Sequence, residues 1–473
     1  MKETGKTIAF LTVAVLLMGT ALVASIPKSS SVDDFNDQGQ PFFPDFKDPA
    51  ACTSLEVVEV DPATASAQPF KVMLKEGRWV IPSHFDYSAD AEDRLAKTAA
   101  KVILLTKDTI RSSRSEDHKL LGVIDPLEQK LASAEGMGKR ITLRDRSDRV
   151  LAEYIIGKDV PGRAGQKYVR RPGQSRTYGV NLQAEPSARF ADWIEPNLLK
   201  LQASQIREAT FDNRKVDVAN RRIIPGETLT ISRKDSTSPW TLAGLPASQE
   251  VDPSKTTALA NALSDLKIVG VRPKPSSLAV LLKGETKGSL EMPELISLQD
   301  KGFYFMRNQL VSDEGAIRIG CDDGVRYELN FGKVTFAQGE ALSAGKGEDA
   351  AKTKDPNKAK EMAGGSASGS VESRFLFVTA QFDPGLVPKP KAAPPTSGEL
   401  PSEVFQRTVS ELKDEAAKAA REKSEYEAKL EAGETRASEL TKRFAPWYYV
   451  VPGDAYRSLV LDRKALLRAK SAE

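Results

Sequence analysis

The sequence predicts an α+β protein: two tandem related modules of mainly antiparallel strands with packed helices, plus an N-terminal transmembrane helix and a long C-terminal helix. Three observations predict this class. Residues 141–158 reappear downstream as residues 317–333, each a strand, a polar turn and a second strand ending in Gly-Lys. The strands and the helix that precede each stretch also follow one order. An apolar run near the N-terminus supplies the membrane helix.

The composition excludes several classes of function. The 473 residues fit roughly two or three domains. With 68 basic against 65 acidic residues, the net charge of +3 is too balanced to indicate a nucleic-acid partner. Two cysteines and two histidines are too few for a disulfide scaffold or a metal site of clustered cysteines. We therefore predict no metal and no cofactor.

The N-terminal segment, residues 1–27, predicts a membrane anchor. Residues 8–26 are an uncharged apolar run, roughly 28 Å long as a helix, which approaches the hydrocarbon thickness of a bilayer. Lys2 and Lys6 outweigh Glu3 ahead of the run, so the N-terminus is expected to be cytoplasmic and the bulk of the chain extracytoplasmic. A cleaved signal peptide is the alternative, although the run is long for one.

Residues 28–54 are rich in Ser, Asp, Pro and Gly, which predicts a tether between the membrane and the first module. Phe42, Phe43 and Phe46 are exceptions in this polar stretch. They either pack on the module or lie at the lipid headgroups, and packing is the simpler interpretation.

The first module is expected over residues 55–185. Its helix is predicted to begin after Ser88 as N-cap, with Leu95, Ala99 and Val102 at i, i+4 and i+7 forming the buried face. The alternation of apolar residues and the turn signals predict strands at 55–60, 70–75, 78–81, 141–158 (a hairpin), 168–171 and 177–180.

The second module, residues 206–383, is expected to repeat this order. Its helix should begin at Asp252 as N-cap, and Leu259, Leu263 and Leu266 repeat the i, i+4, i+7 spacing. The strands expected in it are 206–211, 229–234, 240–242, the hairpin 317–333 and, as the last strand, 374–382.

Four further segments connect or follow the modules. Residues 186–205 are predicted to form a connecting helix, kinked at Pro196. An insertion in the second module, residues 338–373, is rich in Lys, Ala, Gly and Ser and is expected to be disordered. A proline-rich linker occupies residues 384–401. The last segment, residues 446–473, is dense in aromatic residues, which predicts docking onto the body of the protein.

Residues 402–445 predict one long amphipathic helix. Its apolar residues follow a 4-3 heptad spacing that is interrupted at Lys423 and Gly433. Such a stripe is typical of a coiled coil, which would make the helix a surface for homo-oligomers or other partners. A helix that lies along its own module is the alternative, and Gly433 could end the helix early. The sequence leaves both open.

Motifs that resemble catalytic or binding sites lack essential parts. Residues 157–164 (GKDVPGRA) follow a strand like a phosphate loop, but Arg163 and Ala164 replace the Lys and the Ser or Thr that such a loop needs. Residues 136–139 (GMGK) precede a strand rather than a helix, so no helix N-terminus could bind an anion there. Both are predicted to be structural turns.

The two histidines give no catalytic constellation. His84 could act as a base oriented by Asp86, but no nucleophile motif accompanies it, and a surface or turn histidine is expected. His118 lies in a charged stretch and is expected to be exposed. Trp79 and Trp240 occupy equivalent places in both modules, which favours core anchors over sugar-stacking platforms.

Cys52 and Cys321 would meet an oxidising environment outside the membrane, so a disulfide between the modules is conceivable. Cys321 falls at a hairpin turn and Cys52 at the edge of the tether, which makes the pairing the less favoured alternative. Thiol labelling would find both cysteines free if no bond forms.

Several loose motifs together resemble a known family. They are the N-terminal span, the turn at residues 77–79 (GRW), the strand ending in IIGK at 155–158, the KYVR strand at 167–170 and TYGV at 177–180. Over most of residues 55–333 the chain is similar to the bacterial family called domain of unknown function 4340. The resemblance implies a single-pass protein of the bacterial inner membrane that accompanies gliding-motility-type ABC transporters. It implies no catalytic residues, and the insertion and the long helix depart from the family pattern.

The sequence therefore favours a non-enzymatic, membrane-anchored extracytoplasmic scaffold or accessory protein for an ABC-transporter-type envelope complex. The alternative is an extracytoplasmic module that binds a glycan or a peptide between the two copies. A hydrolase is third, because no group of polar residues in the sequence forms a recognisable catalytic set.

Overall fold

The computed structural model of the chain describes residues 37–61, 65–128, 133–182, 185–195, 197–217, 220, 222–246, 248–283, 290–306, 309–335, 372–390 and 405–470. The predicted anchor, almost all of the predicted insertion and most of the proline-rich linker lie outside these residues. Within the described ranges, none of the helices has both the length and the apolar character that crossing a bilayer requires.

The first sheet contains nine strands, all paired antiparallel, in the order β4-β3-β2-β1-β6-β7-β8-β9-β5. Its strands are β1 (Ser54–Asp61), β2 (Ser66–Lys75), β3 (Arg78–Ile81), β4 (Tyr87–Ser88), β5 (Thr109–Ser112), β6 (Lys139–Arg144), β7 (Val150–Asp159), β8 (Gln166–Arg170) and β9 (Thr177–Asn181). The predicted hairpin of residues 141–158 is confirmed as the pair β6 and β7.

The second sheet contains eight strands, also antiparallel, in the order β14-β13-β10-β19-β20-β21-β22-β16. Its strands are β10 (Ile206–Asp212), β13 (Thr228–Ser232), β14 (Thr241–Leu242), β16 (Gly270–Pro273), β19 (Ala316–Cys321), β20 (Val325–Thr335), β21 (Ser373–Phe382) and β22 (Trp447–Pro452). The predicted hairpin of residues 317–333 is confirmed as β19 and β20.

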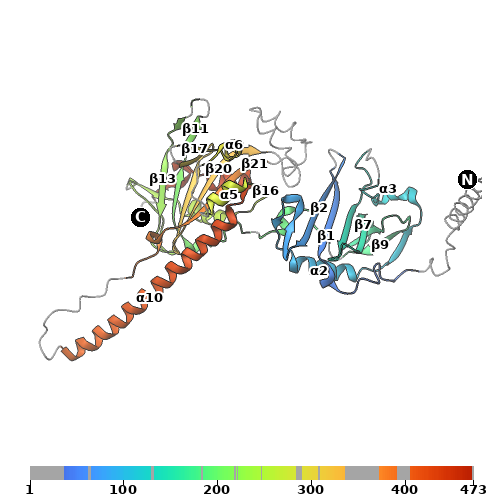
Figure 1. Cartoon of the computed structure of the whole chain (residues 1–473), viewed down its shortest axis with the longest axis horizontal. Coiled ribbons are helices and arrows are strands. Elements are labelled where there is room, and N and C mark those ends of the chain that lie inside the picture. The colour runs from blue at the N-terminus through green and yellow to red at the C-terminus, as the bar shows by residue number, and fades with distance from the viewer. Residues whose placement is uncertain are drawn as a thin grey trace, which may run out of the picture.

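Eight strands of the first sheet have counterparts in the second, in the same spatial order. The order β3-β2-β1-β6-β7-β8-β9-β5 matches β14-β13-β10-β19-β20-β21-β22-β16, strand for strand. In both sheets the edge strand that follows the helix in sequence, β5 or β16, pairs with the strand that comes last, β9 or β22. Figure 1 shows the two sheets as separate lobes joined in the middle of the molecule.

The helices in the described residues are α2 (Glu92–Ile103), α3 (His118–Leu121), α4 (Pro253–Ser264), α5 (Ser276–Leu282), α6 (Met292–Asp300), α10 (Phe405–Phe444), α11 (Gly453–Leu459) and α12 (Arg463–Leu466). Three small antiparallel pairs complete the structure: β11 (Lys215–Asp217) with β12 (Arg222–Ile224), β15 (Gln249–Val251) with β23 (Leu467–Ala469), and β17 (Phe303–Met306) with β18 (Gln309–Ser312). The chain is thus a mixed α and β protein with mostly antiparallel sheets.

The two helices that precede the edge strands largely follow the sequence prediction. Leu95, Ala99 and Val102 are the buried residues of α2, as expected. Asp252 caps α4 by accepting a hydrogen bond from the backbone of Ser254. Ser88 as N-cap of α2 is wrong: it lies in β4, paired with Val80, and the helix begins later, without a side-chain cap.

The predicted connecting helix, residues 186–205, is also wrong. The segment contains only two short 3-10 turns, Phe190–Trp193 and Ala203–Gln205, and its backbone is extended at Arg189 and Ile194. Its apolar residues are nevertheless core residues: Phe190, Trp193, Ile194, Leu198, Leu199 and Leu201 are all buried. The sequence pattern therefore indicated burial correctly but not helicity, because prolines at 186 and 196 interrupt the run of backbone donors.

The start of the first module and the end of the second module differ from the predicted boundaries. Phe42, Phe43 and Phe46 are buried in the core, which confirms packing for this part of the tether. At the other end, β21 is not the last strand of the second sheet. That place belongs to β22, which enters after α10 and buries Tyr448 and Tyr449.

Candidate functional site

The helix α10 docks onto the second sheet through its C-terminal part. The buried side chains on it are Ala437, Leu440 and Phe444, which continue the predicted apolar stripe. They pack against the face of the sheet at β21, and the hydroxyl of Thr441 donates to the Ala380 carbonyl at 2.8 Å. The prediction of one long helix is confirmed, and its C-terminal part lies along its own module.

Gly433 does not end the helix, which runs through it without interruption. It is the point of closest approach between α10 and the turn that joins β19 to β20. A Cβ atom added at Gly433 would collide with the backbone carbonyl of Asp323 in that turn. The glycine therefore permits docking, and the interruption of the heptad spacing reflects this contact.

Two arginines fix α10 to the body by polar contacts. Arg436 forms an ion pair with Asp323, and its Nη2 donates to the carbonyl of Lys200 at 2.7 Å. Arg443 donates to the carbonyl of Asn197 at 3.3 Å. The helix is thus tied both to the sheet and to the segment that connects the two sheets.

The C-terminal end of α10 is held by a buried lysine. Lys274, which follows β16, is 5% exposed; its Nζ donates to the carbonyl of Phe444 at 3.1 Å and lies 3.8 Å from the centroid of the Phe377 ring. Burial lowers the pKa of Lys274 well below its usual range. A donor at this position satisfies one of the carbonyls that a helix C-terminus leaves unpaired.

A gap remains beneath the docked helix. A cavity of about 380 Å³ lies between α10, β21 and the end of α5, lined among others by Val378, Ala437 and Phe444. Its walls are mainly apolar, so it offers little for chemistry.

The remainder of α10 extends away from the body. The helix has 40 residues, which corresponds to about 60 Å at the usual rise per residue. Figure 1 shows its N-terminal part projecting beyond the second lobe. From Ala417 to Lys429 the described side chains are exposed or half-exposed, and Ala419 and Tyr426 are among the half-exposed ones. These two are heptad positions, so an apolar stripe continues where the sheet no longer covers it.

The repeated Gly-Lys of the first module clamps the end of a helix. A Cβ atom at Gly157 would lie 2.5 Å from the carbonyl oxygen of Leu121, the last residue of α3. Next to it, the Nζ of Lys158 donates to the carbonyl of Leu120 at 3.0 Å. The glycine lets β7 approach the helix terminus, and the ammonium group complements the negative end of the helix dipole.

The second module repeats this clamp. A Cβ atom at Gly332 would collide with the carbonyl of Lys301, directly after α6, and the Nζ of Lys333 donates to the carbonyl of Gln299 at 2.7 Å. The Gly-Lys motif therefore has a structural role in both modules. This agrees with the prediction that residues 157–164 are not a phosphate loop. Sequence inspection could recognise the repeat but not the helix end that explains it.

His84 is buried at the junction of the two lobes. It is 2% exposed and lies in a 3-10 turn, so the turn prediction holds while a surface position is wrong. Its ring stacks on Phe190, with 4.4 Å between centroids, and meets Phe70 edge to face. Asp86 does not orient it, because this carboxylate pairs with Lys75 at 2.6 Å.

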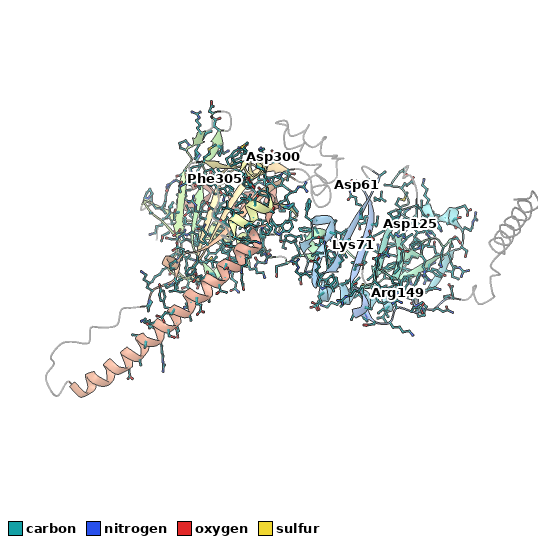
Figure 2. All side chains as sticks on the ribbon, in the orientation of Figure 1. Asp61, Lys71, Asp125, Arg149, Asp300 and Phe305 are labelled. Carbon is teal, nitrogen blue, oxygen red and sulfur yellow. The ribbon has the colours of Figure 1, made fainter. Side chains whose placement is uncertain are left out.

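A cavity of about 460 Å³ adjoins His84. The first module and the connecting segment form most of its wall, and Val269, just before β16, closes it from the second module. Gln68, near the end of the β1–β2 hairpin, also lines it and donates to Asp61 at 3.2 Å. Figure 2 marks Asp61 and Lys71 on this hairpin. The cavity wall thus combines aromatic side chains, such as Phe70 and Phe190, with polar ones, such as Gln68.

Acid should destabilise the protein through His84. Burial, with a smaller contribution from the positive charge of Arg272, lowers the pKa of His84 from 6.5 to about 4. The folded state thus binds the proton less readily than the unfolded state, and stability that is complete above pH 6.5 is lost as pH falls toward 4. We expect a loss of about 2 kcal/mol from this residue between pH 7 and pH 4.5, measured by urea unfolding of the full chain at both pH values.

The variant His84→Phe should keep the stacking and abolish this part of the pH dependence. His118→Gln is the matched control, since His118 is only half-buried and lies 2.8 Å from the Ser175 carbonyl. Equal pH dependence of the wild type and His84→Phe would contradict the assignment.

The remaining sequence candidates have structural surroundings. Trp79 and Trp240 are partly buried against the core, and Arg233 lies over the Trp240 ring at 4.8 Å. Cys52 and Cys321 are both buried and free, so the conceivable disulfide is not formed. Within the described part of the chain, no three metal-binding side chains come together.

A family model described as "Domain of unknown function (DUF4340)" matches residues 79–281. The matched region begins in β3 and ends in α5, so it spans the connection between the two sheets. No curated protein and no solved structure matches the chain.

Proposed function

We propose that the chain, whose residues 79–281 match the DUF4340 family model, is a non-enzymatic scaffold or accessory protein of an ABC-transporter-type envelope complex. Residues 1–27 anchor it in the bacterial inner membrane as a single pass, with the N-terminus cytoplasmic and the bulk of the chain extracytoplasmic. The apolar run at 8–26 and the preceding Lys2 and Lys6 support this location.

The body consists of two copies of one module. The equal strand orders and the repeated Gly-Lys clamps support a duplication. A shared strand order does not require a Gly-Lys clamp, so the two similarities are independent observations. The second copy carries several additions, among them one between β20 and β21 and one, containing α10, between β21 and β22. Additions in the connections between strands leave the strand order unchanged and change what the module presents to partners.

The single observation that carries the proposal is the projection of α10. An isolated helix in water is only marginally stable, and an uncovered apolar stripe at heptad spacing gains stability by pairing with another helix. The docked C-terminal part holds the projecting part in a fixed direction. We infer that this part pairs as a coiled coil, either with a membrane protein of the transporter complex or with a second copy of the chain.

A second function, capture of a small ligand between the two copies, is favoured by one observation. The cavity at His84 lies at the junction of the modules, where ligand sites of two-lobed proteins commonly occur. This function is compatible with the first, since a partner protein can supply the ligand.

The test is gentle detergent extraction and affinity capture of the full chain, with the molar mass of the purified particle measured by light scattering. The wild type should be recovered as a particle larger than a monomer. Ala419→Asp combined with Tyr426→Asp places charge on the apolar stripe and should reduce recovery of this particle at least tenfold.

The matched control is Ala417→Asp combined with Ser424→Asp, which has the same spacing on an exposed face of the helix. It should leave the particle intact. Recovery of the wild type as a monomer alone would overturn the proposal, and so would equal losses in the two double variants.

A further inference from the structure

The projecting part of α10 ends where the body begins. Gly433 is the position of closest approach to the turn between β19 and β20, and from Ala437 onward the stripe is buried against the sheet. On the other side of Gly433 the helix continues back to Phe405. We call residues 405–430 the arm. It is about 39 Å long at the usual rise per residue, and Figure 1 shows it projecting from the second lobe.

The heptad stripe runs along the whole arm. Its members in the sequence are Phe405, Val409, Leu412, Ala416, Ala419, Lys423, Tyr426 and Leu430. The stripe is therefore small at its centre, where two alanines lie, and larger at both ends. Lys423, which interrupts it, is exposed, and its Nζ lies 3.9 Å from a carboxylate oxygen of Glu427 in the same helix. The aliphatic stem of a lysine can cover an apolar residue while its ammonium group stays in water.

The position of the body excludes a parallel pair of two arms. Beyond the arm the same stripe continues through Ala437, Leu440 and Phe444, which are buried against the sheet of their own module. In a parallel pair in register, the sheet of each copy would occupy the place of the other copy's helix at this level. Such a pair would also bring Lys423 against Lys423 of the second copy.

An antiparallel pair avoids both conflicts. When residue 405 of one arm lies opposite residue 430 of the other, each helix ends just before Gly433, where the body of the other copy begins. The core layers in this register join Phe405 to Leu430, Val409 to Tyr426, Leu412 to Lys423 and Ala416 to Ala419. Alanines thus meet at the centre and large side chains meet toward the ends.

Neighbouring antiparallel registers fit less well. A shift by one heptad in one direction brings residue 405 opposite Ala437, which is already buried in the other body. The opposite shift leaves Tyr426 and Leu430 without a facing residue of the helix. The uncovered stripe is therefore complementary to itself in one register, which is the requirement for an interface with two-fold symmetry.

We propose that the arm pairs with the arm of a second copy of this chain, as an antiparallel two-stranded coiled coil in this register. The two bodies then lie at opposite ends of the pair. The inference rests on the proposed function, in which α10 is the partner surface, and it names the partner. Charged residues beside the stripe are exposed, and exposed ion pairs contribute only about 0–1 kcal/mol. Side-chain size and the position of the bodies therefore determine the orientation.

Cysteine cross-linking between two full-length copies tests the proposal. One copy carries Val409→Cys, and the other, which bears a different affinity tag, carries Tyr426→Cys. Both are co-expressed, extracted in mild detergent and oxidised with copper phenanthroline. The mixture should yield roughly tenfold more cross-linked dimer with one copy of each kind than the chain without added cysteines, because a disulfide needs its Cα atoms within about 7 Å.

Each variant alone should stay at the background, since its two cysteines would lie about 25 Å apart along the antiparallel pair. The native Cys52 and Cys321 are buried and contribute little to that background. The matched control is Val409→Cys mixed with Ser424→Cys, because Ser424 is exposed and lies off the stripe. A mixture of Val409→Cys and Tyr426→Cys that stays at the background, a self-linked Tyr426→Cys dimer, or equal cross-linking in the control mixture would each overturn the proposal.

This test and the test of the proposed function fail separately. If affinity capture recovers a particle larger than a monomer but the two copies do not cross-link, the accessory function stands and the self-pairing is wrong. If the copies cross-link and the captured particle contains this chain alone, the self-pairing is correct and the complex with a transporter is wrong.

Discussion

Replacement of Gly433 by alanine should undock α10 and destabilise the second module. Helix propensity alone predicts the opposite, a gain of about 1 kcal/mol, because alanine is the best helix former. The added Cβ atom, however, would collide with the Asp323 carbonyl, a backbone atom that cannot rotate away. We expect a net loss of about 2–3 kcal/mol, measured by urea unfolding of the full chain, with faster hydrogen exchange at residues 433–444.

Ala432→Gly is the control for this experiment. Ala432 is the exposed neighbour, so its replacement should cost only about 1 kcal/mol through propensity. The assignment of Gly433 as a contact residue is wrong if Gly433→Ala stabilises the protein or leaves hydrogen exchange in the docked part unchanged.

Alanine at Gly332 should be equally damaging, and alanine at Gly157 should reproduce the effect in the other module. Each added Cβ atom meets the carbonyl at the end of a helix, Lys301 in one module and Leu121 in the other. We expect a loss of about 2–3 kcal/mol for each variant. Hydrogen exchange followed by mass spectrometry should place the loss in the second module for Gly332→Ala and in the first for Gly157→Ala.

Gly162→Ala is the control, since Gly162 lies in the loop that follows the first clamp. It has a φ of +73°, but an added Cβ atom would meet no other atom within 4 Å. Its replacement should cost about 1–2 kcal/mol from backbone strain alone. A clamp variant that is no worse than this control would show that the close approach to the helix end is unimportant.

The sequence predicted the sheets well because their signals are local. Alternation of apolar residues marked β1, β6, β7, β19 and β20, and the repeated order of elements pointed to a second module built like the first. The position of β22 could not be predicted, because nothing local distinguishes a strand that completes a sheet from an aromatic tail. Its partners β16 and β21 lie far away in sequence.

The candidate sites were harder to predict than the fold for the same reason. The ring of His84 stacks on Phe190 from the connecting segment, and its pKa is lowered in part by the charge of Arg272 from the second module, neither of which is near it in sequence. The false connecting helix had a similar cause. Its apolar spacing satisfied a helical pattern, but those side chains fill the gap between two sheets, where an extended backbone packs equally well.

Because β22 lies near the C-terminal end of the sequence, the two sheets can assemble only at different stages of synthesis on the ribosome. Every strand of the first sheet lies within residues 54–181, so that sheet can assemble soon after it emerges. The second sheet cannot: β16 pairs within its sheet only with β22, about 180 residues later, and until then β16 and β21 present unpaired edges. The second module therefore passes through a long aggregation-prone interval during synthesis, which the first module avoids.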